Sequence, residues 1–504
     1  MIRNKTQTCN YIYLYLCVDV YMYNSGIPKI MSSLLQVVNN KFNIIINKIL
    51  VLNVLIFLVL IHSSSSSSSS SHQTTQQLPP VVVLPGILCS RLGATLNNAT
   101  DAPIICPRNS KFYNIWISDT QFFHPSCFYR RMASTFKNEN RKKKNNNNYT
   151  STSSQQQQQQ CVHNSPGVTI GPIGYGNMSG CNCLNPEDVG PKLNLFLKMT
   201  NTLEKYGYVP GKNLKAVTYD WRLYGDPCFT PILFTQIKEM IETSYSNNGN
   251  TPVVALCHSM GCPILHKFFV SQTKEWKDLY ISQFINICAP FAGAGNSLVE
   301  FINAKPFEWI DRSYVDYLSP VFRSWPGTSS LFPQQIMSKT GSTNNVWENI
   351  TFVQTPDKNY TGADSIYEIL ELLSNDKKRL KEHNYIAYGL KFWNIQEELR
   401  NSVLNKSPGV KSTSCLFLLD VPTPIGSIYA DNMLRKHVKD FFLPGDGTVS
   451  SISVEGPCTI WKNQGENISI EPFHLGKKVT HKAALSSMEI INRVVEKLVG
   501  NVVG

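Results

Sequence analysis

From residue 191 onward, short hydrophobic runs alternate with segments that have helical spacing. This pattern predicts helices over residues 193–206 and 231–245, and strands over residues 214–219 and 284–288. Short buried strands that alternate with helices are typical of a mostly parallel sheet, in which functional sites lie at the carboxyl ends of the strands. We therefore expect an α/β fold in this part of the chain.

One stretch combines a strand, a tight turn and a helix. Val253–Leu256 are all apolar, residues 257–261 form the turn, and apolar residues at helical spacing follow from residue 264. This is the setting of a nucleophile elbow, which presents a serine, here Ser259, above a sheet. The match to G-x-S-x-G is incomplete, because Cys257 occupies the position of the first glycine.

Two later residues complete a candidate catalytic set. Asp446 lies between two glycines after a strand-like run, and His481 immediately precedes an amphipathic helix over residues 488–498. The chain order Ser259, Asp446, His481 is the order found in α/β hydrolases. We predict Ser259 as nucleophile, His481 as its base and Asp446 as the acid that orients the imidazole.

Other residues could take these roles. His474 is an alternative base, although its Pro-Phe-His-Leu setting resembles a strand end. Asp220 is an alternative acid, although pairing with Arg222 is the plainer interpretation. His258 precedes the serine and would point the wrong way for a base, so we expect it to pack or to assist.

The chain begins with features of the secretory route. Residues 49–61 are almost wholly apolar and lie between Lys48 and nine serines, which suits a signal peptide or an uncleaved signal anchor. Asn-x-Ser/Thr sequons agree with glycosylation in that route. The predicted glycosylation sites are Asn98, Asn177, Asn349, Asn359, Asn405 and Asn467.

Disulfides are permitted in that compartment, and 12 of the 14 cysteines follow the apolar segment. We interpret Cys257 and Cys262 as small buried hydrophobic residues rather than redox partners, and Cys89 as packed near the candidate site. Cys106 and Cys127 bracket an aromatic segment. It is either a disulfide-closed loop that presents Trp116 to lipid or a stapled piece of core.

A second strand ends at Pro85-Gly86, early in the chain. The backbone N–H of Ile87, directly after it, is positioned to help form an oxyanion hole. Residues 137–160 are rich in Lys, Asn and Gln, and we expect a disordered insertion there.

Composition narrows the function. The 504 residues are 42% hydrophobic with a net charge of +12, which suits a large core and either a solvated surface or attraction to anionic membrane. No recurring basic-aromatic module supports nucleic-acid binding, and no Cys/His spacing supports a metal site, so we expect neither partner and no cofactor.

These patterns divide the chain into six parts. They are residues 1–72 (signal segment and serine run), 78–100 (first core strand and oxyanion loop), 101–185 (membrane-binding subdomain with the insertion), 186–296 (core with the elbow), 297–410 (cap or lid) and 411–504 (core with acid and base).

Several motifs together resemble one family, that of lecithin:cholesterol acyltransferase and the lysosomal (group XV) phospholipase A2. They run in family order between residues 79 and 498 and are Val83–Leu88, Tyr219–Leu223, Cys257–Gly261, Ala289–Gly293, Val421–Pro424, Gly445–Val449 and His481. The resemblance implies an α/β-hydrolase fold with a mostly parallel sheet, a small membrane-binding subdomain and a cap or lid.

The resemblance also implies individual residues. It assigns Ser259, Asp446 and His481 to catalysis, the backbone N–H groups of Ile87 and Met260 to the oxyanion hole, and Trp116 to lipid contact. It pairs Cys106 with Cys127 and Cys415 with Cys458. The chain departs from the lysosomal enzymes in having Ile87 where they carry an acidic residue and Cys262 where they carry Asn, which puts an inherited preference for acid pH in doubt.

The implied activity is transfer of a phospholipid acyl group through an acyl-serine to water or to a lipid alcohol such as a sterol or ceramide. The substrate surface would be a phospholipid membrane or a lipoprotein-like particle. The alternative is a catalytically inactive, lipid-binding secreted glycoprotein on the same scaffold. The implied location is the secretory pathway, as a secreted, lysosomal or membrane-anchored protein.

Overall fold

The computed structural model describes residues 78–100, 103–116, 125–136, 161–184, 194–304, 321–335, 346–382, 385–397 and 404–503. These all belong to one compact unit, residues 76–504. The apolar segment 49–61 and the low-complexity segment 137–160 lie outside the described residues. Within the described ranges, no helix has the length and apolar character needed to cross a bilayer.

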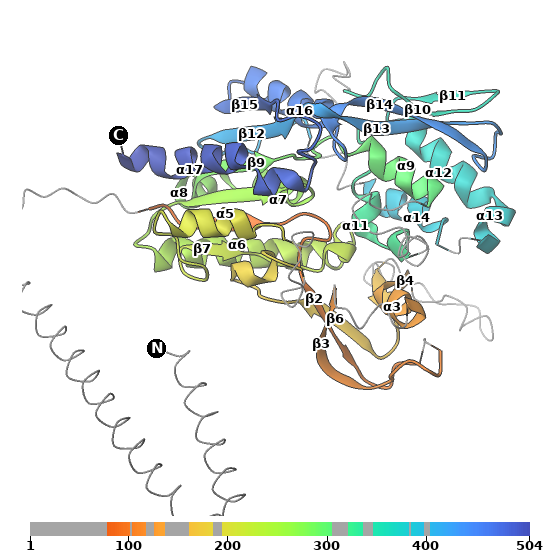
Figure 1. Ribbon diagram of the computed structural model, residues 1–504, viewed down its shortest axis with the longest axis horizontal. Helices are drawn as coiled ribbons and strands as arrows, with labels where there is room; N and C mark the ends of the chain where they lie inside the picture. Colours follow the sequence, from red (N-terminus) through yellow and green to blue (C-terminus); the bar gives the residue numbers. More distant parts are fainter. Residues whose placement is uncertain are drawn as a thin grey trace, which may run out of the picture. The chain divides into compact units, whose positions relative to one another are not determined.

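A six-stranded sheet forms the centre of this unit, and its strands are all paired in parallel (Figure 1). This pairing confirms the expectation of a mostly parallel sheet. β8 and β1 lie inside the sheet, between other strands, and are fully buried. The strand order is β15 (Ile468–Phe473), β12 (Thr413–Leu418), β9 (Ile281–Ile287), β8 (Val253–His258), β1 (Val81–Leu84) and β7 (Leu214–Ala216).

Helices pack on this sheet. Those that bear on the site are α5 (Leu197–Glu204), α6 (Thr230–Asn247), α7 (Gly261–Ser271), α8 (Lys274–Tyr280), α16 (Ser451–Asn463) and α17 (Met488–Val503). α6 and α7 contact β1 and β8, and α16 contacts β12 and β15. Two predicted elements are shorter in the structure. α5 begins at Leu197, and β7 ends at Ala216 because the chain turns into a short 3-10 helix that Asp220 caps.

A second sheet lies beside the first, with the strand order β11 (Asn359–Thr361), β10 (Thr351–Gln354), β13 (Asp420–Tyr429) and β14 (His437–Asp446) (Figure 1). It joins strands from residues 346–361, in the segment predicted as a cap, to the hairpin β13–β14. Four helices accompany it: α9 (Gly295–Asn303), α12 (Ser365–Asn375), α13 (Lys377–Glu382) and α14 (Tyr388–Ile395). β14 ends at Asp446, so this sheet delivers the predicted acid.

A small third sheet has the order β3 (Ser110–Trp116), β2 (Leu92–Leu96) and β6 (Val168–Pro172), next to α3 (Pro125–Met132) and the strand pair β4 (Ser134–Phe136) and β5 (Val162–Asn164). Buried tryptophans tie it to the core. The ring of Trp221 packs edge-on against Trp116 (5.2 Å between ring centroids) and against Trp325 (4.9 Å). Edge-to-face aromatic contacts of this kind stabilise a shared core.

Candidate active site

Ser259 occupies a strained turn between β8 and α7. Its φ is 54°, in the left-handed region that non-glycine residues rarely adopt. Two glycines allow this turn to form against β1. A Cβ on Gly261 would lie 2.2 Å from the carbonyl oxygen of Leu84, and one on Gly86 would lie 2.6 Å from the Cβ of Ser259. The sequence therefore folds here into a nucleophile elbow that has glycine where the backbones nearly touch.

A chain of hydrogen bonds connects the three residues predicted to act together. The Oγ of Ser259 lies 2.8 Å from Nε2 of His481, and Nδ1 of His481 lies 2.7 Å from a carboxylate oxygen of Asp446. The three come from different elements: the elbow, the segment before α17 and the end of β14. Ser259 is 6% exposed and Asp446 is 2% exposed. The arrangement is that of a serine nucleophile, its base and an orienting acid.

Asp446 is held in its charged form. Burial alone would raise the pKa of its carboxyl group, but the His481 ring and the N–H groups of Val449 and Thr448 outweigh burial and bring the pKa below its ordinary value. Those two N–H groups donate to the other carboxylate oxygen at 2.7 and 2.9 Å. His481 also donates its backbone N–H to the carbonyl oxygen of Asp446 at 2.8 Å. The acid and the base are thus fixed together at both backbone and side chain.

The loop after β1 lies beside the elbow. Its conformation is held by the hydroxyl of Tyr219, which donates to the carbonyl oxygen of Pro85 at 3.0 Å, and by a positive φ of 63° at Leu88. In the described part of the chain, the N–H groups of Ile87 and Met260 have no acceptor. Two N–H groups without an acceptor, one on the residue after the serine and one on the neighbouring loop, are the kind of donors that an oxyanion hole requires.

Comparison with known proteins identifies the family of this chain. The family model described as "Lecithin:cholesterol acyltransferase" matches residues 149–491, well over half of the sequence. The chain belongs to the lecithin:cholesterol acyltransferase family. Its parallel sheet and elbow give it the α/β-hydrolase fold expected of that family.

The chain is similar over most of its length to two proteins that are named as enzymes. A rat (Rattus norvegicus) "Lysosomal phospholipase A and acyltransferase" is 26% identical over 82% of this chain and 89% of its own length. A rabbit (Oryctolagus cuniculus) "Phosphatidylcholine-sterol acyltransferase" is 25% identical over 82% of this chain and 84% of its own. Both relatives are enzymes, so the match is to the enzymes of the lecithin:cholesterol acyltransferase family.

One residue implied by the family resemblance lies elsewhere than expected. Trp116 is 1% exposed, and its indole N–H donates to the carbonyl oxygen of Leu88 at 2.9 Å. Its ring packs against Trp221 and Phe128. The prediction of lipid contact at Trp116 is therefore wrong for this structure, because the indole N–H has a buried acceptor and the ring packs against the buried ring of Trp221. Trp116 instead supports the loop after β1.

The alternative acid and base are both engaged elsewhere. Asp220 forms a buried ion pair with Arg222 (2.6 Å), and Arg222 also donates to the carbonyl oxygen of Met132 at 2.9 Å. His474 lies just past the end of β15, and its Nδ1 is 2.8 Å from a carboxylate oxygen of Asp420. Neither Asp220 nor His474 is part of the hydrogen-bonded chain to Ser259.

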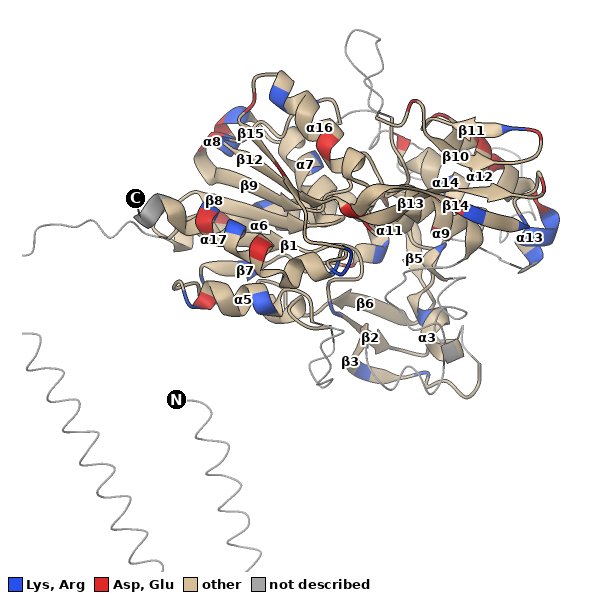
Figure 2. Ribbon diagram, turned by 45° about the horizontal axis from the view of Figure 1, so that its top comes forward, with Lys and Arg blue, Asp and Glu red and all other residues tan. Residues whose placement is uncertain are grey.

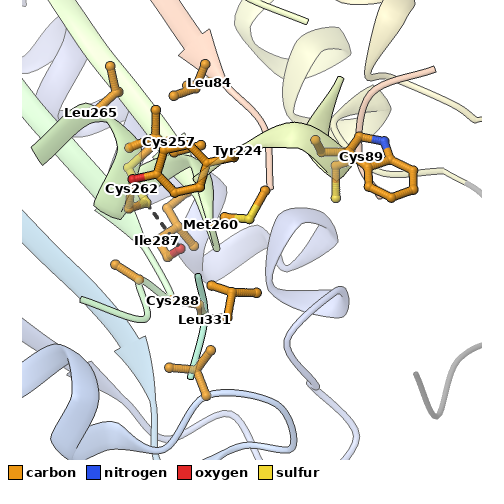
Figure 3. Packing of buried hydrophobic residues seen from close by; sticks show 14 of the residues in the cluster. Leu84, Cys89, Tyr224, Cys257, Met260, Cys262, Leu265, Ile287, Cys288 and Leu331 are labelled. Atoms are coloured by element: carbon orange, nitrogen blue, oxygen red, sulfur yellow. Dashed lines mark hydrogen bonds between the residues drawn. A yellow bond between two sulfur atoms is a disulfide. The ribbon is translucent and has the colours of Figure 1, made fainter. Parts of the chain in front are cut away.

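Four disulfides are present among the described residues. Cys106–Cys127 and Cys415–Cys458 are the pairs that the family resemblance implies. Cys161–Cys228 joins the strand pair β4–β5 to the start of α6. The fourth, Cys257–Cys262, spans the elbow from the end of β8 to the first turn of α7 (Figure 3).

The disulfide at the elbow corrects the interpretation of Cys257 and Cys262 as unpaired small hydrophobic residues. Their Cα atoms lie 5.1 Å apart, because the strand and the helix diverge from one sharp turn. Cys89 is a free cysteine, and its burial agrees with the expectation that it packs.

Sequence reasoning missed Cys288, a free cysteine at the end of β9. Its sulfur, a carboxylate oxygen of Asp446 and a ring nitrogen of His481 all lie within 4.8 Å of one another. Such a group could suggest a metal site. However, the histidine and aspartate atoms are 2.7 Å apart, whereas two ligands of a tetrahedral zinc ion stand about 3.3 Å apart. We therefore interpret the group as hydrogen-bonded.

Proposed function

We propose that this chain is a serine-dependent lipid acyl-ester enzyme, a phospholipase A and O-acyltransferase. The hydrogen-bonded chain from Ser259 through His481 to Asp446 is the observation that carries this proposal. Membership of the lecithin:cholesterol acyltransferase family and the names of the rat and rabbit relatives, a phospholipase A and a phosphatidylcholine-sterol acyltransferase, support a phospholipid as the acyl donor.

In the proposed reaction, the Oγ of Ser259 attacks the ester carbonyl carbon of a phospholipid while Nε2 of His481 takes the hydroxyl proton. The N–H groups of Ile87 and Met260 stabilise the oxyanion. The tetrahedral intermediate collapses, the ester bond breaks, and His481 returns the proton to the departing lysophospholipid alkoxide. Ser259 then carries the acyl group.

The second half of the reaction decides the product. Water or a lipid alcohol gives its proton to His481 and attacks the acyl-serine, which releases a free fatty acid or a new ester. A sterol and ceramide are the two lipid alcohols that we propose as acceptors. The same Ser259, His481 and Asp446 serve both outcomes, so no cofactor and no metal ion takes part in the proposed chemistry.

The test is product analysis by mass spectrometry after purified full-length protein meets phosphatidylcholine liposomes that contain a sterol or, separately, ceramide. We expect lysophospholipid together with fatty acid, sterol ester or acylceramide, and we expect all of them to disappear in Ser259→Ala. Ser271→Ala, at the exposed end of the elbow helix, is the matched control. Liposome binding with no Ser259-dependent product at acid or neutral pH would overturn the proposal in favour of an inactive lipid-binding glycoprotein.

We also propose a surface for contact with the lipid. Ile104, Ile105 and Phe112 are 91%, 65% and 59% exposed, and they lie next to the Cys106–Cys127 disulfide at the start of β3. Basic residues accompany them at Arg108 and Lys111. Figure 2 shows basic residues on β3 and also on α3, which carries Arg130 and Arg131. An exposed apolar cluster with basic neighbours suits an anionic phospholipid surface.

Co-sedimentation with anionic liposomes tests this surface. We expect Ile104→Ser/Ile105→Ser to weaken binding, because less apolar area would be buried in the bilayer. Ile232→Ser, at a 56% exposed isoleucine on α6, is the matched control and should bind like the unmodified chain. Equal binding by the two variants would place the lipid contact elsewhere.

The chain is further proposed to pass through the secretory pathway and to reach a lysosomal or extracellular location. The side chains of Asn98, Asn349, Asn359 and Asn467 are exposed, as glycosylation requires. Asn405 is half-buried, and Asn177 is half-buried with its side chain accepting the N–H of Ser179. We expect treatment of the secreted or organelle-derived protein with an N-glycosidase to lower its mass. An unchanged mass would argue against glycosylation.

A further inference from the structure

Cys288 lies where β9 ends, one strand away from the strand that carries Ser259. Its φ of 52° turns the chain sharply, and its backbone N–H donates to the carbonyl oxygen of Leu416 on β12 at 2.8 Å. The side chain is fully buried and is one of the free cysteines. Figure 3 shows it among the hydrophobic residues packed below the elbow, beside Ile287.

The thiol of Cys288 lies beside the acid of the catalytic chain. Its sulfur, a carboxylate oxygen of Asp446 and a ring nitrogen of His481 all lie within 4.8 Å of one another. Burial first, and then the charge of Asp446, raise the pKa of this thiol well above its ordinary value. The thiol therefore keeps its proton at neutral pH and is available as a hydrogen-bond donor.

Asp446 has room for this additional donor. One carboxylate oxygen accepts the N–H groups of Thr448 and Val449, and the other accepts from His481. A carboxylate offers about four lone-pair positions, so the S–H of Cys288 can occupy the remaining one. Three elements thus converge on one acid: the turn after β14, the segment before α17 and the end of β9.

We propose that Cys288 is a positioning residue for the catalytic chain: its thiol donates a hydrogen bond to Asp446 and so sets the orientation and the charge of the acid that faces His481. This inference rests on the proposed function, because it concerns the same three residues. It assigns to Cys288 an effect on catalysis that is exerted through Asp446, with no contact to the substrate.

The effect on His481 has a definite sign. Each donor to Asp446 withdraws negative charge from the oxygen that faces the imidazole, so fewer donors make His481 a stronger base. Among the described residues, the other titratable group that faces this pair is His258, on β8. Burial, and then the neighbouring His481, lower the pKa of His258 to about 3, so its ring is neutral at neutral pH. A change at Cys288 should therefore shift one ionisation alone.

The experiment compares Cys288→Ser, Cys288→Ala and Cys288→Gly in the full chain by measuring kcat/KM against pH with a phospholipid substrate. Ala and Gly remove the donor, so the acid limb of the profile should move up by about half a pH unit. Ser restores a donor stronger than the thiol, so its acid limb should lie at or below that of the unmodified chain.

Two controls separate a positioning effect from a packing effect. Gly suits the positive φ at residue 288, so agreement between the Ala and Gly variants would show that backbone strain is not the cause. Cys181→Ala removes another buried free thiol, one that donates to the carbonyl oxygen of Met178 and does not touch the catalytic residues, and its acid limb should not move.

The outcomes are distinct from those that test the function itself. Absence of Ser259-dependent product from the unmodified chain would remove the proposed function, and this inference with it. An active unmodified chain whose Ser, Ala and Gly variants all share one acid limb would overturn the inference alone. An active chain with the acid limbs in the order Ser, Cys, then Ala and Gly together would support it.

Discussion

The ring of His258 supports the backbone of His481: its Nε2 lies 3.1 Å from the carbonyl oxygen of His481, and the two rings are 4.6 Å apart. His258 directly precedes the proposed nucleophile, so the residue before Ser259 holds the residue that is proposed to deprotonate it. The low pKa of His258 keeps its ring neutral, and the hydrogen bond requires its proton on Nε2. His258 therefore assists by position rather than as a second base.

This contact predicts a small and specific loss of activity. His258→Leu removes the donor, and kcat should fall about fivefold to tenfold, because a neutral hydrogen bond that places the base is lost. His258→Gln keeps an N–H donor and should retain most of the activity. Neither variant should shift the kcat/KM profile between pH 5 and 8. A shift in that range would mean that His258 titrates there and takes part in proton transfer.

The close approach of β1 to the elbow predicts the effect of one methyl group. In Gly86→Ala the new Cβ would lie 2.6 Å from the Cβ and 3.2 Å from the Oγ of Ser259, so it would displace the nucleophile. A displacement of about 1 Å costs about 100-fold in kcat.

Steady-state kinetics of this variant, together with its circular dichroism, provide the check. Gly171→Ala is the matched control, since no atom lies within 4 Å of its new Cβ, and its kcat should not change. Full activity in Gly86→Ala would show that the loop after β1 moves to accommodate the new methyl group without displacing Ser259.

Much of this site could be predicted because its signals are local. Val253–Leu256 form a buried strand, and the turn that follows requires small residues, so the elbow follows from the sequence alone. Asp446 and His481 could be placed by chain order, since each lies at a recognisable boundary, the end of β14 and the segment before α17. The parallel pairing of the sheet likewise follows from strands that alternate with helices.

The remaining features depend on contacts that the sequence does not encode locally. Tryptophan is a residue type that often anchors proteins to lipid. Trp116 is buried instead, because its indole N–H donates to the carbonyl oxygen of Leu88 and its ring packs against Trp221. Cys257 and Cys262 both occupy positions in apolar stretches of the sequence, and only the sharp turn between β8 and α7 brings their sulfur atoms together. Cys288 follows a strand of the six-stranded sheet, and Asp446 ends a strand of the four-stranded sheet. No sequence motif links the two residues, so their proximity could not be predicted.

The disulfides predict unequal costs in stability. The Cys415–Cys458 bond closes a separation of 43 residues and the Cys257–Cys262 bond one of 5 residues. Loop-closure entropy then assigns about 4 and about 2 kcal/mol to the two bonds. Urea unfolding of the two paired Cys→Ala variants would measure both.

The loss of activity should be larger for the disulfide whose removal costs less stability. The short bond holds the turn that presents Ser259, whereas the long bond ties β12 to α16 away from the nucleophile. We therefore expect a larger loss of kcat in Cys257→Ala/Cys262→Ala, measured at a temperature where both proteins are folded. Equal kcat values would mean that the strand and helix hold the elbow without the disulfide.

An ion-pair cluster on β15 predicts a pH-dependent stability. Burial alone would raise the pKa of Glu471, but hydrogen bonds from Arg493, Lys497 and Ser469 outweigh it and bring the pKa from 4.5 to about 2. Because the folded pKa is depressed, the stabilisation is complete above about pH 4.5 and is lost as the pH falls towards 2. Glu471→Gln should therefore lower the free energy of unfolding by about 1–2 kcal/mol at pH 7.

Urea unfolding at pH 7, 5 and 3 would measure this difference between Glu471→Gln and the unmodified chain. The difference should be equal at pH 7 and 5 and smaller at pH 3, because the unmodified carboxylate loses its advantage as the pH approaches its folded pKa. Glu496→Gln, at a 62% exposed partner of Arg493, is the control and should change stability little at any pH. A Glu471 difference that stays constant from pH 7 to 3 would assign its effect to packing of α17 on β15 rather than to charge.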